Sequence, residues 1–172
     1  MKIRIHSHLL LAGAALLALA LPLAAADAPP PPDPMRQTIQ DIRSVGTAMY
    51  AWYKDEMAPK RSEEAHKKAE EAAKTTSVDI SAVPAISRDE LAKVLVPRYL
   101  AAIPEKDGWG HPYDFHLDTR NPDASPAMGL RSAGRDGKFS GDVYEVGAFS
   151  PDDVDQDVSW LDGYFVRWPQ KK

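Results

Sequence analysis

The chain has 172 residues, of which 44% are apolar and 27% are charged, and these values are ordinary for one globular domain. It contains no cysteine, which excludes a disulfide scaffold, a thiol nucleophile and any cysteine-ligated metal site. The formal net charge is −4, whereas a general nucleic-acid binder carries an excess of basic residues. The composition therefore predicts a folded, acidic domain without nucleic acid as a partner.

Residues 1–26 have the three-part layout of a secretory signal peptide. Lys2 and Arg4 precede a charge-free run from Leu9 to Ala26 that is rich in Leu and Ala and ends in three alanines. We expect cleavage after Ala26 and an exported protein, either periplasmic or extracellular. The alternative is an uncleaved segment that anchors the protein, since the run just reaches the lower length limit of a membrane-spanning helix.

Residues 27–34 are predicted to form a proline-rich linker, because four consecutive prolines hold an extended conformation and cannot continue a helix. Asp33 followed by Pro34 is typical of a helix N-cap with proline in the first helical position. Apolar residues then recur at steps of three and four until shortly before Pro59, which predicts a long helix with one buried face. The residues of that face are Met35, Ile39, Ile42, Val45, Met49 and Trp52.

Residues 60–80 consist largely of charged residues and alanine, with several Glu and Lys residues four positions apart. This pattern predicts a charged helical insertion that is exposed to solvent. Ser87 and Glu90 form a capping box, which predicts a second, shorter helix that ends by Pro97.

After Pro104 the sequence changes to short apolar or alternating segments separated by Gly, Pro, Asp and Asn. Such segments are typical of short antiparallel strands joined by loops, and they comprise residues 113–117, 128–133, 144–146 and 164–168. Helices followed by strands predict an α+β domain over residues 35–172, in which a long N-terminal helix packs on a small antiparallel sheet.

The segment between Leu130 and Asp162 holds eight acidic and three basic residues. Within it Asp153, Asp155 and Asp157 alternate, so that several carboxylates can converge on one point. Calcium takes six to eight oxygen ligands of this kind, while the missing cysteines and few histidines argue against zinc or copper. The residues alone leave both a calcium loop and a solvated acidic surface open.

Three stretches resemble one known family: DIRSVGTAMYAWYKDE, YLAAIPEKDGWGHPYDF, and LRSAGRDGKFSGD followed by DVDQDVSW. In order and spacing they are similar to the major pseudopilin, protein G, of type II secretion systems, over residues 36–57 and 98–162. The resemblance implies a pilin-like head with one calcium ion in its C-terminal loop. Carried over by position, the calcium ligands would be the side chains of Asp136, Asp155 and Asp157 and the backbone carbonyls near Ala133 and Phe139.

The sequence departs from this family at its start, where it lacks the short prepilin leader and places a proline-rich segment between the apolar run and the long helix. We therefore expect no filament formation by the protein alone. The leading hypothesis is an exported, non-enzymatic structural or interaction protein with a calcium-stabilised loop. Its partners would be proteins of secretion or of the cell envelope, and it would contact the membrane only through an uncleaved N-terminal segment. The alternatives are a periplasmic binding module unrelated to secretion and a hydrolase that uses the acidic loop.

Overall fold

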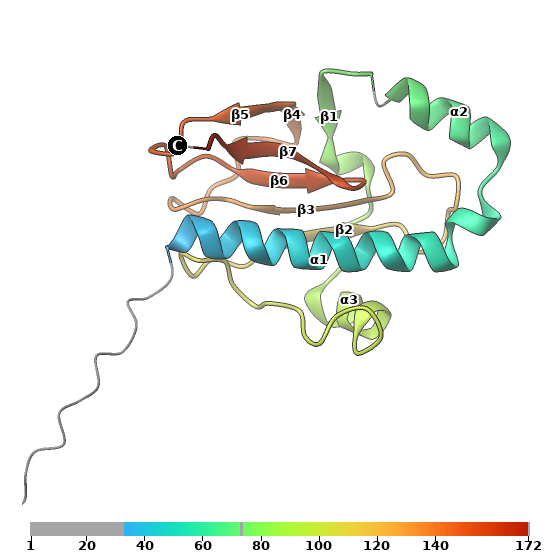
Figure 1. The fold of residues 1–172 in the computed structure, drawn as a ribbon, viewed down its shortest axis with the longest axis horizontal. Coiled ribbons are helices and arrows are strands. Elements are labelled where there is room, and N and C mark those ends of the chain that lie inside the picture. Colours follow the sequence, from blue (N-terminus) through green and yellow to red (C-terminus); the bar gives the residue numbers. More distant parts are fainter. Residues whose placement is uncertain (1–32, 73, 172) are drawn as a thin grey trace, which may run out of the picture. The chain divides into compact units, whose positions relative to one another are not determined.

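The computed structural model describes residues 33–72 and 74–171. The expected signal peptide and most of the proline-rich linker lie outside the described residues. Among the helices in the described part of the chain, none is both long and apolar enough to cross a membrane. The described chain is an α+β domain in which a helix packs on a sheet (Figure 1), as the order of elements in the sequence predicts.

Helix α1 spans Pro34–Glu56, and the Oδ1 atom of Asp33 caps it by accepting hydrogen bonds from the first backbone amides. The N-cap and the first-position proline are therefore confirmed. Because α1 begins at residue 34, it is not at the N-terminus of the chain, and that part of the prediction is wrong. The apolar stripe is buried against strands β3 (Met128–Ser132) and β6 (Val158–Leu161), with Ile42, Val45 and Met49 fully inaccessible.

Two further α-helices follow, α2 over Glu63–Ala72 and α3 over Arg88–Leu95, and short 3-10 turns lie at Ala58–Lys60 (η1) and Ile80–Ala82 (η2). The α2 helix is charged, and Ala65 is its one buried residue. The helical insertion predicted over residues 60–80 is an exposed α-helix only in this part, because residues 77–79 form a short strand and Ile80 is fully buried. The capping box of Ser87 and Glu90 starts α3 as predicted.

The main sheet has five strands in the order β2-β3-β6-β7-β5, and a separate pair joins β1 to β4. All neighbours run antiparallel except β5 and β7, which are parallel, so the prediction of a purely antiparallel sheet is wrong. Strand β7 lies between β6 and β5. It runs antiparallel to β6, and because β5 runs in the opposite direction to β6, β7 is parallel to β5. The bounds are β1 Ser77–Asp79, β2 Asp114–Leu117, β3 Met128–Ser132, β4 Val143–Glu145, β5 Gly147–Phe149, β6 Val158–Leu161 and β7 Tyr164–Pro169.

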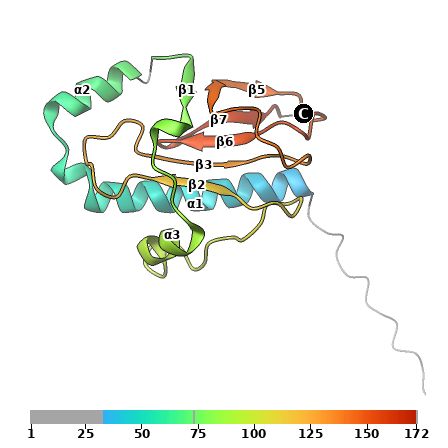
Figure 2. The same cartoon turned by 180° about the vertical axis from the view of Figure 1, so that it is seen from behind.

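Both faces of the central strands are covered. On one face α1 buries the side chains of Leu130 and Trp160 in the larger apolar cluster. On the other face Leu161 packs with Ile80 and Tyr144, which come from η2 and β4. Figure 2 shows β1 and the segment after it in front of the sheet, on the side away from α1. The sheet is therefore the middle layer of the domain, and this burial fixes the strands that carry the acidic loop.

Candidate functional site

Two loop segments come together beyond the end of β3, one over residues 133–141 and the other over residues 150–157. The backbone N–H of Arg135 donates to the carbonyl of Val154 at 2.9 Å. Gly134 has a φ of 65°, and a Cβ atom there would lie only 2.8 Å from the carbonyl oxygen of Gln156. Glycine thus permits a close approach of the two backbones. The structure places side by side the two segments that the sequence assigned to a calcium loop.

Asp155 forms a two-point ion pair with Arg135 across these segments. The Nε atom of Arg135 donates to Oδ1 of Asp155 at 2.9 Å, and a terminal guanidinium nitrogen donates to Oδ2 at 2.8 Å. Hydrogen bonding by Arg135 holds the pKa of Asp155 below its usual value. Both side chains are exposed, at 61% for Arg135 and 42% for Asp155, so water and dissolved ions reach this pair.

Asp157 lies deeper, with only 3% of its surface exposed. Its Oδ2 atom accepts three hydrogen bonds, from the backbone N–H and hydroxyl of Ser140 and from the hydroxyl of Tyr144, at 2.9, 2.7 and 2.8 Å. Its Oδ1 atom is buried and has no hydrogen-bond partner among the described residues. One oxygen of this carboxylate is therefore fully satisfied, while the other lacks a donor or cation.

The three other predicted ligand positions differ in exposure. Asp136 is exposed, and its Oδ1 accepts the backbone N–H of Lys138 at 3.0 Å. Ala133 is buried, whereas Phe139 is 39% exposed. Among residues 33–72 and 74–171 no three His, Asp or Glu side chains are grouped so as to hold a metal ion. The predicted ligands thus lie on two adjacent loop segments. The carboxylates of Asp155 and Asp157 accept hydrogen bonds from other side chains of the protein.

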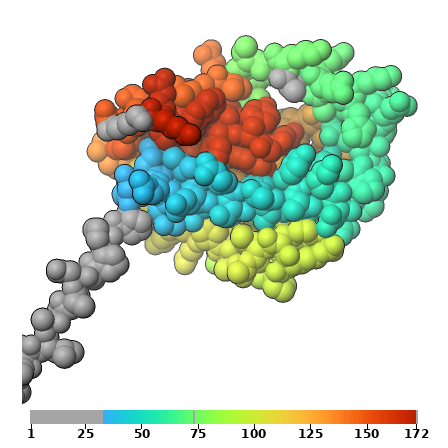
Figure 3. Space-filling view, viewed as in Figure 1, coloured from blue at the N-terminus to red at the C-terminus, as the bar shows by residue number. Residues whose placement is uncertain are grey.

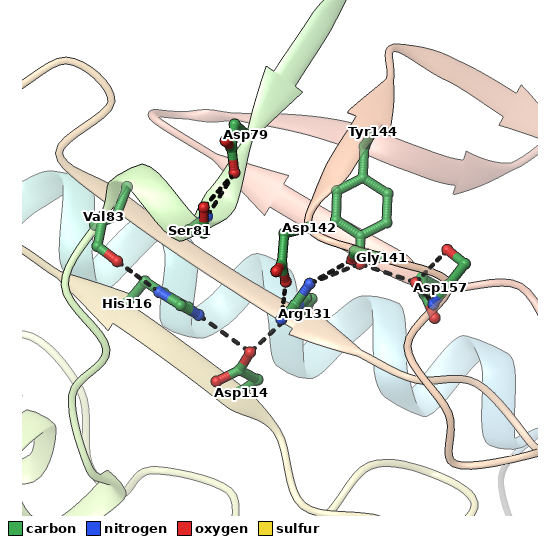
Figure 4. Close-up of polar contacts among 11 residues, drawn as sticks. Asp79, Ser81, Val83, Asp114, His116, Arg131, Gly141, Asp142, Tyr144 and Asp157 are labelled. Atoms are coloured by element: carbon green, nitrogen blue, oxygen red, sulfur yellow. Dashed lines mark hydrogen bonds and ion pairs between the residues drawn. The ribbon is translucent and has the colours of Figure 1, made fainter.

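Behind the loop lies a buried polar network centred on Arg131 of β3 (Figure 4). Its Nε donates to Asp114 at 2.8 Å, and one terminal nitrogen donates to the carbonyl of Gly141 and the hydroxyl of Tyr144 at 2.8 and 3.0 Å. The other terminal nitrogen pairs with Asp142 at 3.0 Å. A single guanidinium therefore ties β2, β3, β4 and the acidic loop together.

The protonation states in this network follow from burial and hydrogen bonding. Burial acts to lower the pKa of Arg131, but its hydrogen bonds to Tyr144 and Asp114 outweigh burial and raise it. Burial, together with the charge of Asp157, raises the pKa of Tyr144. Arg131 is thus charged and Tyr144 neutral at physiological pH, so the phenol accepts from the arginine and donates its proton to Asp157.

His116 extends the network to the far side of β2. Its Nδ1 lies 2.8 Å from the carbonyl oxygen of Val83, and its Nε2 lies 3.1 Å from Oδ2 of Asp114. Both partners only accept, so the two hydrogen bonds together require a proton on each ring nitrogen. Burial acts to lower the pKa of His116, but the bonds to Asp114 and Val83 outweigh it and raise the pKa. The ring connects the segment before α3 to the sheet.

Sequence reasoning concentrated on the acids and missed Arg131, which pairs with Asp114 and Asp142. The available signal was an arginine inside an otherwise apolar strand, because a buried guanidinium needs several acceptors. His111 and His116 have separate partners: Nε2 of His111 lies 3.1 Å from the carbonyl oxygen of Arg135, whereas His116 contacts Val83 and Asp114.

The fold and this site define a small α+β domain whose acidic loop is closed by contacts between its own cations and carboxylates. The chain matches no family model, and comparisons with curated proteins and with solved structures give no match.

Proposed function

We propose that this chain is an exported, non-enzymatic, pseudopilin-like protein with a structural or protein-binding role in secretion or in the cell envelope. The proposal rests on the three stretches that resemble protein G. They fall on α1, on the segment that leads into β2, and on β3 with the acidic loop that follows it. These elements belong to one domain, in which the helix precedes the sheet and the acidic loop segments connect its strands.

The observation that carries the proposal is the contact between segments 133–141 and 150–157, which joins the acids before β4 to those before β6. In this loop the carboxylates of Asp155 and Asp157 accept hydrogen bonds from arginine, serine and tyrosine side chains. Groups engaged in this way hold a surface in shape. This favours a role in binding a protein partner over a role as a catalytic acid or base.

Calcium is part of the proposal. The carboxylates of Asp136, Asp155 and Asp157 would hold the ion, with the backbone carbonyls of Ala133 and Phe139, and the ion would neutralise acids that otherwise repel one another. The buried Oδ1 of Asp157, which has no donor among the described residues, supports this fit. Arg135 opposes it at one point, because its guanidinium already occupies both oxygens of Asp155. We therefore expect calcium and Arg135 to compete for this carboxylate.

The proposed role is tested by isolating the tagged protein from the cells that produce it and identifying the bound proteins by mass spectrometry. Components of a secretion system or of the envelope should be recovered, and chelation or Asp155→Ala should reduce their recovery more than Asp89→Asn, which changes an exposed acid on α3. Recovery of no such component, or recovery that is the same in all variants, would contradict the role. Electron micrographs of the purified protein should show no regular filaments, because proline interrupts the continuity of the apolar segment with α1.

A further inference from the structure

A cavity of about 440 Å³ lies between the last turns of α1, helix α2 and the end of the sheet where β6 turns into β7. Small-molecule sites have volumes of about 300–1,000 Å³ and are mostly apolar with a few polar groups. Figure 3 shows the hollow between the arm that carries α2 and the body of the domain. Apolar side chains form much of its wall, among them Val78, Ala69, Ala72, Met128 and Leu161.

The composition of α2 explains why this space is open. Ala65, Ala69 and Ala72 are spaced so that they share one face of the helix. Ala65 is buried, and the other two line the cavity. Alanine side chains are too short to reach the sheet from this helix, so the fold leaves a cavity where leucine or isoleucine would have completed a core.

Asp162 supplies a charged group at the cavity wall. It turns the chain from β6 into β7 with a φ of 44°, and its Oδ1 accepts the backbone N–H groups of Ala127 and Met128 at 2.9 and 3.0 Å. In the described part of the chain, no residue donates a hydrogen bond to its Oδ2. No Lys, Arg or His side chain there lies within ion-pair distance of Asp162 either.

Burial raises the pKa of Asp162, although the two backbone hydrogen bonds and the nearby charge of Arg61 act to lower it. Removing a carboxylate from water costs free energy unless a cation or further donors are supplied. Asp162 is thus a partly desolvated acid at a cavity wall, where Arg61 acts on it only from beyond ion-pair distance.

Three tyrosines line the cavity together with this acid. Tyr50 and Tyr164 are 44% and 41% exposed and lie close to the turn at Gly163. Tyr53 lies deeper, and its hydroxyl accepts a hydrogen bond from Arg61. Aromatic faces attract ammonium groups. Arg61 and Lys54 also line the cavity, but the guanidinium of Arg61 is bound to the Tyr53 hydroxyl and to two backbone carbonyls.

We propose that this cavity binds a small organic amine, whose ammonium group pairs with Oδ2 of Asp162 and whose apolar body packs against Met128, Leu161 and the alanines of α2. The tyrosines enclose the cationic end. The site lies apart from the acidic loop, so it stands or falls independently of the pseudopilin-like role.

The test is calorimetric titration with three phenyl compounds of similar size that differ in their polar end: phenethylamine, 3-phenylpropanol and 3-phenylpropionate. The amine should bind at least about tenfold more tightly than the alcohol, because the charged hydrogen bond adds to the apolar contact. The propionate should bind most weakly. Absence of amine binding, or tighter binding of the propionate through Lys54 and Arg61, would overturn the proposal.

Two variants locate the site. Asp162→Asn keeps an oxygen for the amides of Ala127 and Met128 but removes the charge, so the amine should lose its advantage over the alcohol. The matched control Asp89→Asn removes an exposed acid on α3 and should leave binding unchanged. Ala69→Leu fills the cavity from the surface of α2 and should abolish binding of both compounds. Amine binding that persists in Ala69→Leu would place the site elsewhere and reject the proposal.

Discussion

Arg131 and Arg135 are four residues apart, and both bind carboxylates, but their surroundings are opposite. The Arg131 side chain is only 8% exposed and contacts two acids, a phenol and a carbonyl, whereas Arg135 is 61% exposed and contacts one acid. Removing Arg131 takes a buried cation away from several acceptors at once, while an exposed pair exchanges readily with water and salt. The comparison separates a fixed part of the acidic region, around Arg131, from an exposed part, around Arg135, where we propose that a cation binds.

The largest effect should come from Arg131→Met, which removes the centre of the network and leaves the buried Tyr144 hydroxyl and Asp114 short of a donor. We expect a loss of about 3 kcal/mol in the free energy of unfolding, the low end for broken buried ion pairs, because Asp114 and Asp142 remain 31% and 57% exposed. Urea denaturation measures this loss. Arg135→Met is the matched control and should cost far less. Equal losses in the two variants would contradict the difference between the sites.

Tyr144→Phe removes one hydroxyl that accepts from Arg131 and donates to Asp157. Two buried partners each lose a hydrogen bond, so the expected cost is about 1–3 kcal/mol. Tyr50→Phe, at an exposed position of α1, is the control and should leave the urea midpoint nearly unchanged. A Tyr144→Phe protein as stable as the wild type would show that the phenol does not connect Arg131 to Asp157.

His116 gives the fixed part a pH dependence. Its pKa is raised in the folded protein above the ordinary 6.5, so its contribution to stability is complete below pH 6.5 and is lost as the pH rises through the folded value. The facing charged groups, Asp114 and Arg131, keep their charges in this range. The urea midpoint of the wild type should therefore fall with rising pH more steeply than that of His116→Gln. Parallel pH profiles would show that the ring is neutral when folded.

The smallest effect should come from salt on the exposed pair. Screening weakens interactions between solvated charges, so added sodium chloride should reduce the already small stability difference between the wild type and Arg135→Ala. The difference between the wild type and Arg131→Met should respond less. Urea titrations at low and high salt provide the measurement. A stronger salt response for Arg131→Met than for Arg135→Ala would contradict the view that Arg131 is shielded and Arg135 is solvated.

Local signals in the sequence were sufficient for the helices. Asp33 and Pro34 define the start of α1, and Ser87 with Glu90 defines the start of α3, because capping depends on residues only a few positions apart. Strand β6 was missed. Val158–Leu161 is buried on both faces, so it lacks the alternation by which a strand is recognised, and the acids before it suggested a loop.

The site was predictable only in outline. Residue counts placed an acidic region between β3 and β6, and the structure brings its two halves together. The particular pairs depend on tertiary contacts: Arg135 meets Asp155 twenty positions away, and Arg131 meets Asp114 seventeen positions away. No periodicity or spacing in a single sequence specifies such partners.

The central claim, that the outer loop takes a calcium ion in place of the Arg135 contact, is tested most directly by calorimetric titration of chelator-treated wild type, Arg135→Ala and Lys138→Ala. Each variant removes one positive charge from the same loop, but only Arg135 occupies Asp155. We predict that calcium binds the wild type more tightly than magnesium does, and that Arg135→Ala strengthens calcium binding more than Lys138→Ala. Absence of calcium binding at millimolar concentration in both the wild type and Arg135→Ala would contradict the claim.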